Sequence, residues 1–247
     1  MTKPVLVVKV GTSTLLDREE APSGAFEYVA FSIMALSTEY DIVLVTSGAI
    51  GFGVTQLRLG ERPTGLSELQ ALSMIGQVGL LRRWRESFDG VTIGQVLVTT
   101  RDLEQRATTN LFRESVQAVW RYGAVPIVNE NDAISTEEIS FGDNDRLAAE
   151  VARVLGAERL VLLTDQDGIQ AEFGTDAQRR LDTVSIDEID VHIHPTKSVL
   201  GKGGASSKVA AARVALEAGV DVFVAHAGNE RALEHALSGV AGTKIVQ

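Results

Sequence analysis

The chain has 247 residues, of which 45% are hydrophobic, so it is long enough to bury a sizeable core. It contains no cysteine, which excludes disulfides, thiolate nucleophiles and cysteine-ligated zinc, and no apolar run reaches the length of a membrane span. The net charge of −10 comes without a basic stripe, which argues against nucleic-acid binding. We therefore expect a cytoplasmic protein with neither a nucleic-acid nor a membrane partner.

Strand and helix patterns alternate along the chain, and apolar spacing separates the two. In chain order, the sequence predicts a strand at 5–10, a helix at 26–36, a strand at 42–46, a helix after the turn at 47–49, a helix at 66–78, a strand at 91–99, a helix at 103–122, a strand at 125–128, a helix at 146–155, a strand at 160–164, a helix at 205–218, a strand at 222–224, a helix at 231–237 and a strand at 243–246. Residues 171–199 show weak periodicity, which predicts short strands, turns and loops. The alternation indicates an α/β fold with a mostly parallel sheet between helix layers, in a single domain spanning 1–247.

Polar residues gather at both ends of one excursion that follows the strand at 125–128. They are Asn129, Glu130, Asn131 and Asp132 at one end, and Asp143, Asn144 and Asp145 at the other. In open α/β sheets, ligand pockets lie beyond the carboxyl ends of the strands. The sequence therefore predicts a polar pocket here, and the alternative is a solvated acidic loop with a helix N-cap.

Two glycine turns follow the first two strands. Lys9 precedes Gly11-Thr12-Ser13, where glycine lets backbone N–H groups approach an oxyanion and the lysine adds charge. Ser47 and Gly48 open a helix, whose N-terminus favours an anion. An ordinary glycine turn and a serine N-cap are the alternative interpretations.

Two further motifs lie in the second half. Residues 201–208 read Gly-Lys-Gly-Gly-Ala-Ser-Ser-Lys and run into a helix, without the residue order of a P-loop. Thr164 and Asp165 end a strand before an Asp-Gly turn. A flexible linker and a plain turn are the alternatives, but all four motifs fall where strands hand over to loops or helices. Together with the Asn and Asp clusters they indicate phosphoryl transfer to a small polar acceptor.

The segments that carry these residues resemble the amino acid kinase family, in the family's order and over nearly the whole chain. They are Val8–Ser13, Val45–Ile50, Gly76–Gln77, Gly94–Arg101, Val125–Ile134, Glu138–Asp145, Leu162–Gly168 and Gly203–Lys208. The run Val-Pro-Ile-Val-Asn-Glu-Asn-Asp followed by Phe-Gly-Asp-Asn-Asp is specific to the members that phosphorylate glutamate. Relatives often carry a C-terminal PUA domain, and the expectation for this chain is one kinase domain without it.

The resemblance implies an open αβα sandwich, the amino acid kinase fold, and ATP-dependent phosphorylation of the side-chain carboxylate of L-glutamate on the route to proline. It also implies Mg²⁺, held mainly by the ATP phosphates, a homo-oligomer (dimer or tetramer) and feedback inhibition by proline. The alternatives are a related kinase for another carboxylate, carbamate or phosphate, and a non-catalytic ATP or amino-acid sensor.

The resemblance also implies roles for individual residues. Those for glutamate are Ser47, Gly48, Asn129, Asp132, Asp143 and Asn144. Those for ATP are Lys9, Gly11, Thr164, Asp165, Lys202, Gly203, Gly204, Ala205, Ser206, Ser207 and Lys208. Lys9, Lys208 and Asp145 are the expected catalytic residues: the two lysines would converge on the transferring phosphoryl group, with Asp145 between them to orient them.

Overall fold

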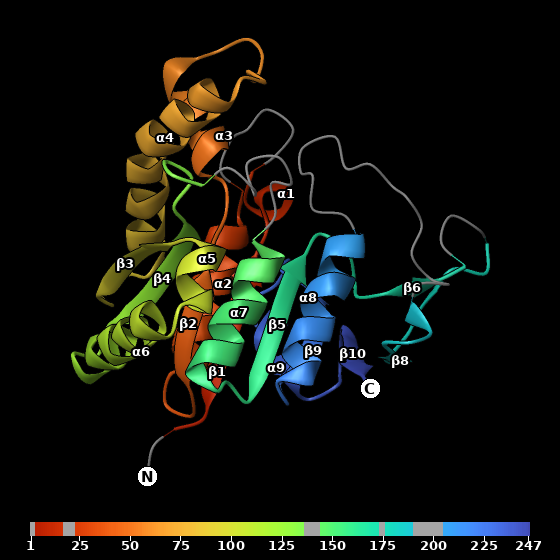
Figure 1. Cartoon of the computed structure of the whole chain (residues 1–247). Coiled ribbons are helices and arrows are strands. Elements are labelled where there is room, and N and C mark those ends of the chain that lie inside the picture. Colours follow the sequence, from red (N-terminus) through yellow and green to blue (C-terminus); the bar gives the residue numbers. More distant parts are fainter. Residues whose placement is uncertain (1–2, 17–22, 136–143, 173–175, 190–204) are drawn as a thin grey trace.

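The chain forms one large open sheet. The computed structural model describes residues 3–16, 23–135, 144–172, 176–189 and 205–247. The sheet has the strand order β3-β4-β2-β1-β5-β9-β10-β8 (Figure 1). Its strands are β1 (Val5–Val10), β2 (Asp41–Val45), β3 (Ile93–Val98), β4 (Val125–Glu130), β5 (Arg159–Thr164), β8 (Thr183–Ser185), β9 (Asp221–His226) and β10 (Thr243–Val246).

The first six strands in this order run parallel to one another. Strand β1 pairs with β2 on one side and β5 on the other, and β10 is antiparallel to β9. The carboxyl ends of β3, β4, β2, β1, β5 and β9 therefore meet at one edge of the sheet. The mostly parallel sheet predicted from the sequence is confirmed.

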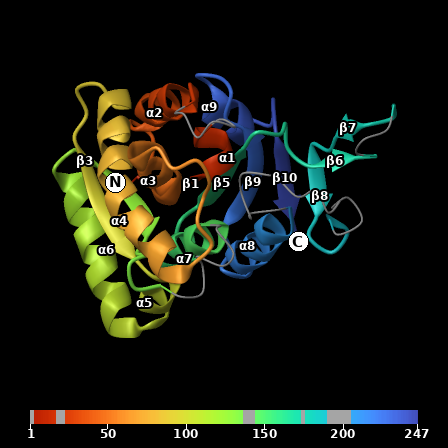
Figure 2. The same ribbon diagram turned by 90° about the horizontal axis from the view of Figure 1, so that it is seen from above.

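Helices cover both faces of the sheet. They are α1 (Thr12–Leu15), α2 (Ala25–Leu36), α3 (Ala49–Leu57), α4 (Leu66–Ser87), α5 (Thr100–Glu104), α6 (Arg106–Arg121), α7 (Asp145–Leu155), α8 (Ala205–Glu217) and α9 (Ala232–Leu237). Figure 2 shows α2 and α9 on one face and α6, α7 and α8 on the other. No helix in the described part of the chain has both the length and the apolar character needed to span a membrane.

The alternation of side chains along the strands creates two cores. In β1, Val7 faces a buried cluster with α7 and α8, whereas Leu6 and Val8 face a second cluster with α2, α4 and α9. A strand buried on both faces reads as a continuous apolar run, which is why these segments could be recognised as strands. The open αβα sandwich expected from the sequence is confirmed.

Local structure differs from the sequence-based expectation in three places. The helix predicted at 103–122 is split into α5 and α6, because Thr99 and Asp102 form a capping box that starts a helix early and Gln105 has an extended backbone. The turn expected after Gly11 is the short helix α1. In the weakly periodic region, β6 (Gln170–Ala171) and β7 (Arg179–Arg180) form a separate hairpin, and β8 joins the main sheet.

Helices α3 and α4 rise beyond the carboxyl edge of the sheet and lie side by side (Figure 1). Their backbones touch, because glycines stand at the crossing. A Cβ atom at Gly76 would lie 1.9 Å from the carbonyl oxygen of Ala49, and one at Gly53 would lie 2.2 Å from that of Leu72. The two helices therefore fit together only without side chains at these two positions.

We predict that Gly76→Ala destabilises the protein, because its methyl group would displace the α3 backbone. Overpacking typically costs about 1–3 kcal/mol, and a backbone obstacle leaves little room for relaxation. Gly79→Ala is the matched control, since its Cβ would meet side chains and no backbone, with the Phe52 ring nearest at 3.1 Å, while alanine favours the helix by about 1 kcal/mol. Urea denaturation of both variants measures the difference, and equal stabilities would contradict this account of the contact.

Candidate functional site

A buried cluster of two lysines and one aspartate lies at the carboxyl edge of the sheet. Lys9 Nζ is 2.5 Å from Asp145 Oδ1, and Lys208 Nζ is 3.0 Å from Asp145 Oδ2. The hydroxyl of Ser207 also donates to Oδ2, at 3.2 Å. The side chain of Asp145 is fully buried and that of Lys9 is 2% exposed, so these charges face each other away from bulk water.

Three elements that are distant in sequence bring this cluster together. Lys9 is near the carboxyl end of β1, Asp145 is the first residue of α7, and Lys208 stands in the first turn of α8. A carboxylate at a helix N-terminus is stabilised by the helix dipole, whereas a lysine there is not. The two ammonium groups and two helix N-termini against one carboxylate leave the cluster with a local excess of positive charge, suited to an anion.

A network of amide groups lies next to this cluster, at the ends of β2 and β4. Asn129 Oδ1 accepts from the backbone N–H of Glu130 (3.0 Å) and from Asn144 Nδ2 (2.7 Å). Asn144 Nδ2 also donates to the carbonyl of Thr46, at 2.6 Å. Because a backbone N–H can only donate, the Asn129 oxygen must face Glu130, which fixes the orientation of the whole amide.

Helix α4 completes this network from the side. The amide of Gln77 accepts from Asn129 Nδ2 at 2.8 Å, and the hydroxyl of Ser73 donates to Asp132 Oδ2 at 2.8 Å. At the end of β2, Thr46 Oγ1 accepts from Trp84 Nε1 at 2.9 Å, and both groups are buried. Asn129, Asp132 and Asn144 are thus held by contacts from three different elements.

The other residues singled out in the sequence lie along the same edge. Ser47 is buried, and Gly48 has a left-handed backbone (φ 105°) at the start of α3, which explains the glycine. A Cβ at Gly11 would lie 3.4 Å from Lys9 Nζ, so the glycine leaves room beside the ammonium. Thr164 is the last residue of β5 and Asp165 follows it, and the Thr164 hydroxyl donates to Asp165 Oδ1 at 3.1 Å.

The last part of the candidate site is only partly described. Ser206 is exposed near the start of α8, and Ala205 is the first residue of that helix. Asp143, Lys202, Gly203 and Gly204 lie outside the described residues. Their proposed contacts with glutamate and ATP stay predictions.

Four residues of this region were not assigned a role from the sequence: Thr46, Ser73, Gln77 and Trp84. Ser73 is a polar residue that is buried beside the apolar stripe of α4, and Gln77 lies four positions further along the helix. Polar side chains four residues apart, at the margin of a buried helical face, were the available signal. It was weak, because serine and glutamine are also common on solvated helix surfaces.

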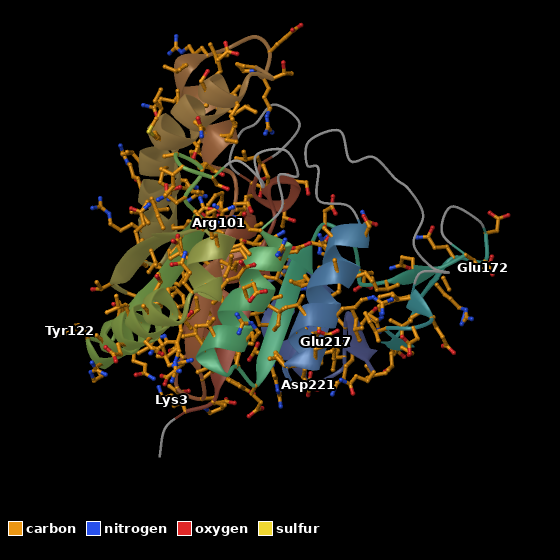
Figure 3. The ribbon with its side chains drawn as sticks, viewed as in Figure 1. Lys3, Arg101, Tyr122, Glu172, Glu217 and Asp221 are labelled. Carbon is orange, nitrogen blue, oxygen red and sulfur yellow. The ribbon has the colours of Figure 1, made fainter. Side chains whose placement is uncertain are left out.

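Figure 3 shows how this edge relates to the rest of the molecule. Arg101, just after β3, lies on the side of the carboxyl ends, whereas Lys3 and Asp221 lie at the opposite edge. A cavity of about 340 Å³ opens near that opposite edge, between Arg159, Asp221 and Lys244. In the wall of this cavity, Lys244 Nζ lies 3.0 Å from Asp221 Oδ2, so these two charges neutralise each other.

The chemistry that this edge can perform follows from its charges. Among the residues that the structure describes, no group of three or more His, Cys, Asp or Glu side chains could hold a metal ion. The cluster instead offers two cations in fixed positions, next to amide and carboxylate groups that can bind a small polar molecule. Preorganised cations stabilise charge that develops during a reaction, because they need not reorient.

We predict strong energetic coupling between Lys9 and Asp145. Asp145→Leu should lower the free energy of unfolding by about 3–5 kcal/mol, because it leaves the buried ammonium of Lys9 without this carboxylate. Lys9→Met combined with Asp145→Leu should recover much of that loss, since a buried pair replaced by apolar groups costs little. Urea denaturation of the four proteins in this cycle measures the coupling, and losses that simply add would contradict it.

Known proteins share the sequence pattern and the fold of this chain. The model of the amino acid kinase family matches residues 4–226. The chain is 41% identical over 238 residues to the glutamate 5-kinase of Mycobacterium tuberculosis (strain ATCC 25618 / H37Rv), covering 91% of this chain and 61% of that protein. It is 39% identical over 251 residues to the glutamate 5-kinase of Nocardia farcinica, covering 96% and 66%. The chain thus spans a little under two thirds of the length of these relatives.

Solved structures share the fold at low sequence identity. Carbamate kinase from Giardia lamblia, bound to AMP-PNP, superposes with a TM-score of 0.69 at 15% identity, covering 99% of this chain and 98% of that one. UMP kinase from Ureaplasma parvum gives a TM-score of 0.67 at 11% identity, with both chains fully covered. The matched family model, the relatives and the shared fold lead to one conclusion: the chain belongs to the amino acid kinase family.

Proposed function

We propose that this protein transfers the γ-phosphoryl group of ATP to the side-chain carboxylate of L-glutamate and forms L-glutamyl 5-phosphate, the first step of proline biosynthesis. The observation that carries the proposal is the placement of Lys9 and Lys208 on the two oxygens of buried Asp145. The identity of about 40% with glutamate 5-kinases over most of this chain supports glutamate as the acceptor.

The reaction has to bring two anions together. A glutamate carboxylate has a pKa of about 4.3 in water, so it is already ionised at neutral pH and needs no general base. One of its oxygens forms a bond to the γ-phosphorus while the bond from that phosphorus to the leaving oxygen of ADP breaks. No proton has to move in this step, and the barrier comes from charge and orientation.

In this proposal, Lys9 and Lys208 neutralise the negative charge of the transferring phosphoryl group, and Asp145 holds the two lysines in position. Asp145 contacts Lys9 and Lys208 through different oxygens, so each ammonium has a fixed position relative to the other. Both oxygens of Asp145 are already engaged by the lysines, and an ionised glutamate carboxylate needs no base. Asp145 is therefore a positioning residue in this mechanism and not a base.

The amide network provides the binding side of the proposed site. Asp132 would supply the counter-charge for the substrate ammonium, while Asn129, Asn144 and Ser47 would hold its polar groups. Thr164, Asp165 and the start of α8 would hold ATP. Mg²⁺ prefers to keep phosphate oxygens and water as ligands, which suits a site where the nucleotide supplies most of them, and there it would neutralise phosphate charge.

Two other candidates stay open to experiment. One is phosphorylation of another carboxylate, a carbamate or a phosphate. Carbamate kinase and UMP kinase, which share the fold, are named for acceptors of this kind. The other is a non-catalytic sensor of ATP or an amino acid. The intact cluster of Lys9, Asp145 and Lys208 argues against a sensor, because the proposed catalytic residues are all present. Homo-oligomer formation, inhibition by proline and a cytoplasmic location also stay predictions.

An acceptor screen tests the proposed reaction. With ATP, Mg²⁺ and hydroxylamine, glutamate should give a hydroxamate, because hydroxylamine traps an acyl phosphate. Aspartate and N-acetylglutamate, with a shorter chain and a blocked ammonium group, should give much less product. Product from a different acceptor alone would move the chain to another reaction within the family, and ATP binding without any turnover would favour the sensor.

We predict that Lys208→Ala lowers kcat by about 10²–10³-fold, because a preorganised cation is lost where charge develops. The variant should stay folded, since buried Asp145 keeps its ion pair with Lys9. Lys244→Ala is the matched control, because it removes a lysine from the opposite edge of the sheet. Steady-state kinetics and urea denaturation check both variants, and a nearly normal kcat for Lys208→Ala would refute the two-lysine mechanism.

A further inference from the structure

Helix α4 has two chemically different sides at the level of the candidate site. Its polar side chains Ser73 and Gln77 face Asp132 and Asn129, with hydrogen bonds of 2.8 Å each. The neighbouring residues Met74 and Val78 are exposed, at 57% and 74%. Ser73 and Gln77 are four positions apart, which places both on the same face of the helix.

The contact from Gln77 limits what Asn129 can do. The oxygen of the Asn129 amide is already directed to the backbone of Glu130 and to Asn144, and its nitrogen then points to Gln77. Gln77 therefore supplies the acceptor that completes this orientation. Without that acceptor, a donor of a buried side chain would lose a hydrogen bond, and the amide would gain freedom to rotate.

The contact from Ser73 acts in the same way on Asp132. Ser73 is buried, at 5% exposure, and its hydroxyl donates to Oδ2 of a carboxylate that follows β4. A hydroxyl that donates to a carboxylate fixes its rotation and also stabilises its charge. Asp132 lies in the turn that follows β4, so a contact from a long helix restrains a residue that the sheet itself does not hold.

The position of α4 is itself fixed at this level. Gly76, next to Gln77, is the residue whose Cβ would collide with the α3 backbone. The collision would be with Ala49, the first residue of α3, which directly follows Ser47 and Gly48. The backbone contact thus anchors the turn of α4 that carries the two polar contacts.

We propose that Ser73 and Gln77 are positioning residues that set the affinity for the amino-acid substrate, by aligning Asp132 and Asn129 respectively. The proposal rests on the proposed function, since it takes glutamate as the ligand of these two residues. Neither side chain is proposed to touch the reacting atoms. Their removal should therefore affect glutamate binding much more than ATP binding.

The test is a pair of double-mutant cycles, read from the KM for glutamate, the KM for ATP and kcat. Gln77→Met keeps the size of the side chain but removes the acceptor, and should raise the KM for glutamate by roughly 5- to 100-fold. Ser73→Ala should also raise the KM for glutamate. Met74→Ala and Val78→Ala, one residue further along on the exposed side, are the matched controls and should leave all three values unchanged.

The cycles distinguish positioning from a direct or purely structural role. If Gln77 acts through Asn129, the variant Asn129→Ala combined with Gln77→Met should be no worse than Asn129→Ala alone, and Asp132→Ala combined with Ser73→Ala should behave likewise. Losses that multiply, or a KM for ATP that rises in parallel, would overturn the proposal. Urea denaturation of each single variant shows whether a loss follows from unfolding.

The wild-type protein separates this inference from the proposed function. Hydroxamate formation with glutamate, together with independent losses in the cycles, would overturn the positioning role alone. Absence of product with glutamate from the wild-type protein would overturn the proposed function, and with it the assignment of glutamate as the ligand.

Discussion

The two ion pairs of the Asp145 carboxylate are the interactions on which the rest of this site depends. The carboxylate is fully buried and contacts two lysines that come from β1 and α8. Burying an isolated charge is costly, so the burial of Asp145 depends on its contacts with these lysines. The cluster thereby joins the centre of the sheet to the helix layer above it, and it requires α7 and α8 to begin at the same place.

This constraint also explains why buried polar groups gather at the edge, whereas most of the remaining interior is apolar. Below the edge, both faces of β1 pack against apolar clusters built from Val, Leu, Ile and Ala. At the edge, backbone groups leave the sheet ladder and need new partners, which side chains such as Asn144 supply. In the proposed function, residues that would bind the substrate also stabilise the edge of the sheet, so a change at one of them would affect both properties.

Much of this could be predicted from the sequence, because the physical signals are local. Apolar runs identified the strands, and parallel strands place their carboxyl ends together, so Lys9, Asn129 and Asp145 could be assigned to one edge before any coordinates were known. The contacts made by Ser73 and Gln77 could not be predicted, since they depend on how α4 is turned and on the glycine contact with α3. The break between α5 and α6 was missed for a different reason: the capping box at Thr99 competes with a helical pattern that continues past it.

The glycine contact between α3 and α4 has a thermodynamic consequence for the whole molecule. With no side chain between the backbones at Gly53 and Gly76, these helices cannot shift independently at that point. A molecule that moved this pair by binding the exposed side of α4 would therefore also move Ser73 and Gln77, and would change the affinity of the proposed site for glutamate. Linkage makes this coupling reciprocal, so glutamate would change the affinity for that molecule by the same factor. A close backbone contact of this kind would thus couple the exposed side of α4 to the side that faces the proposed site.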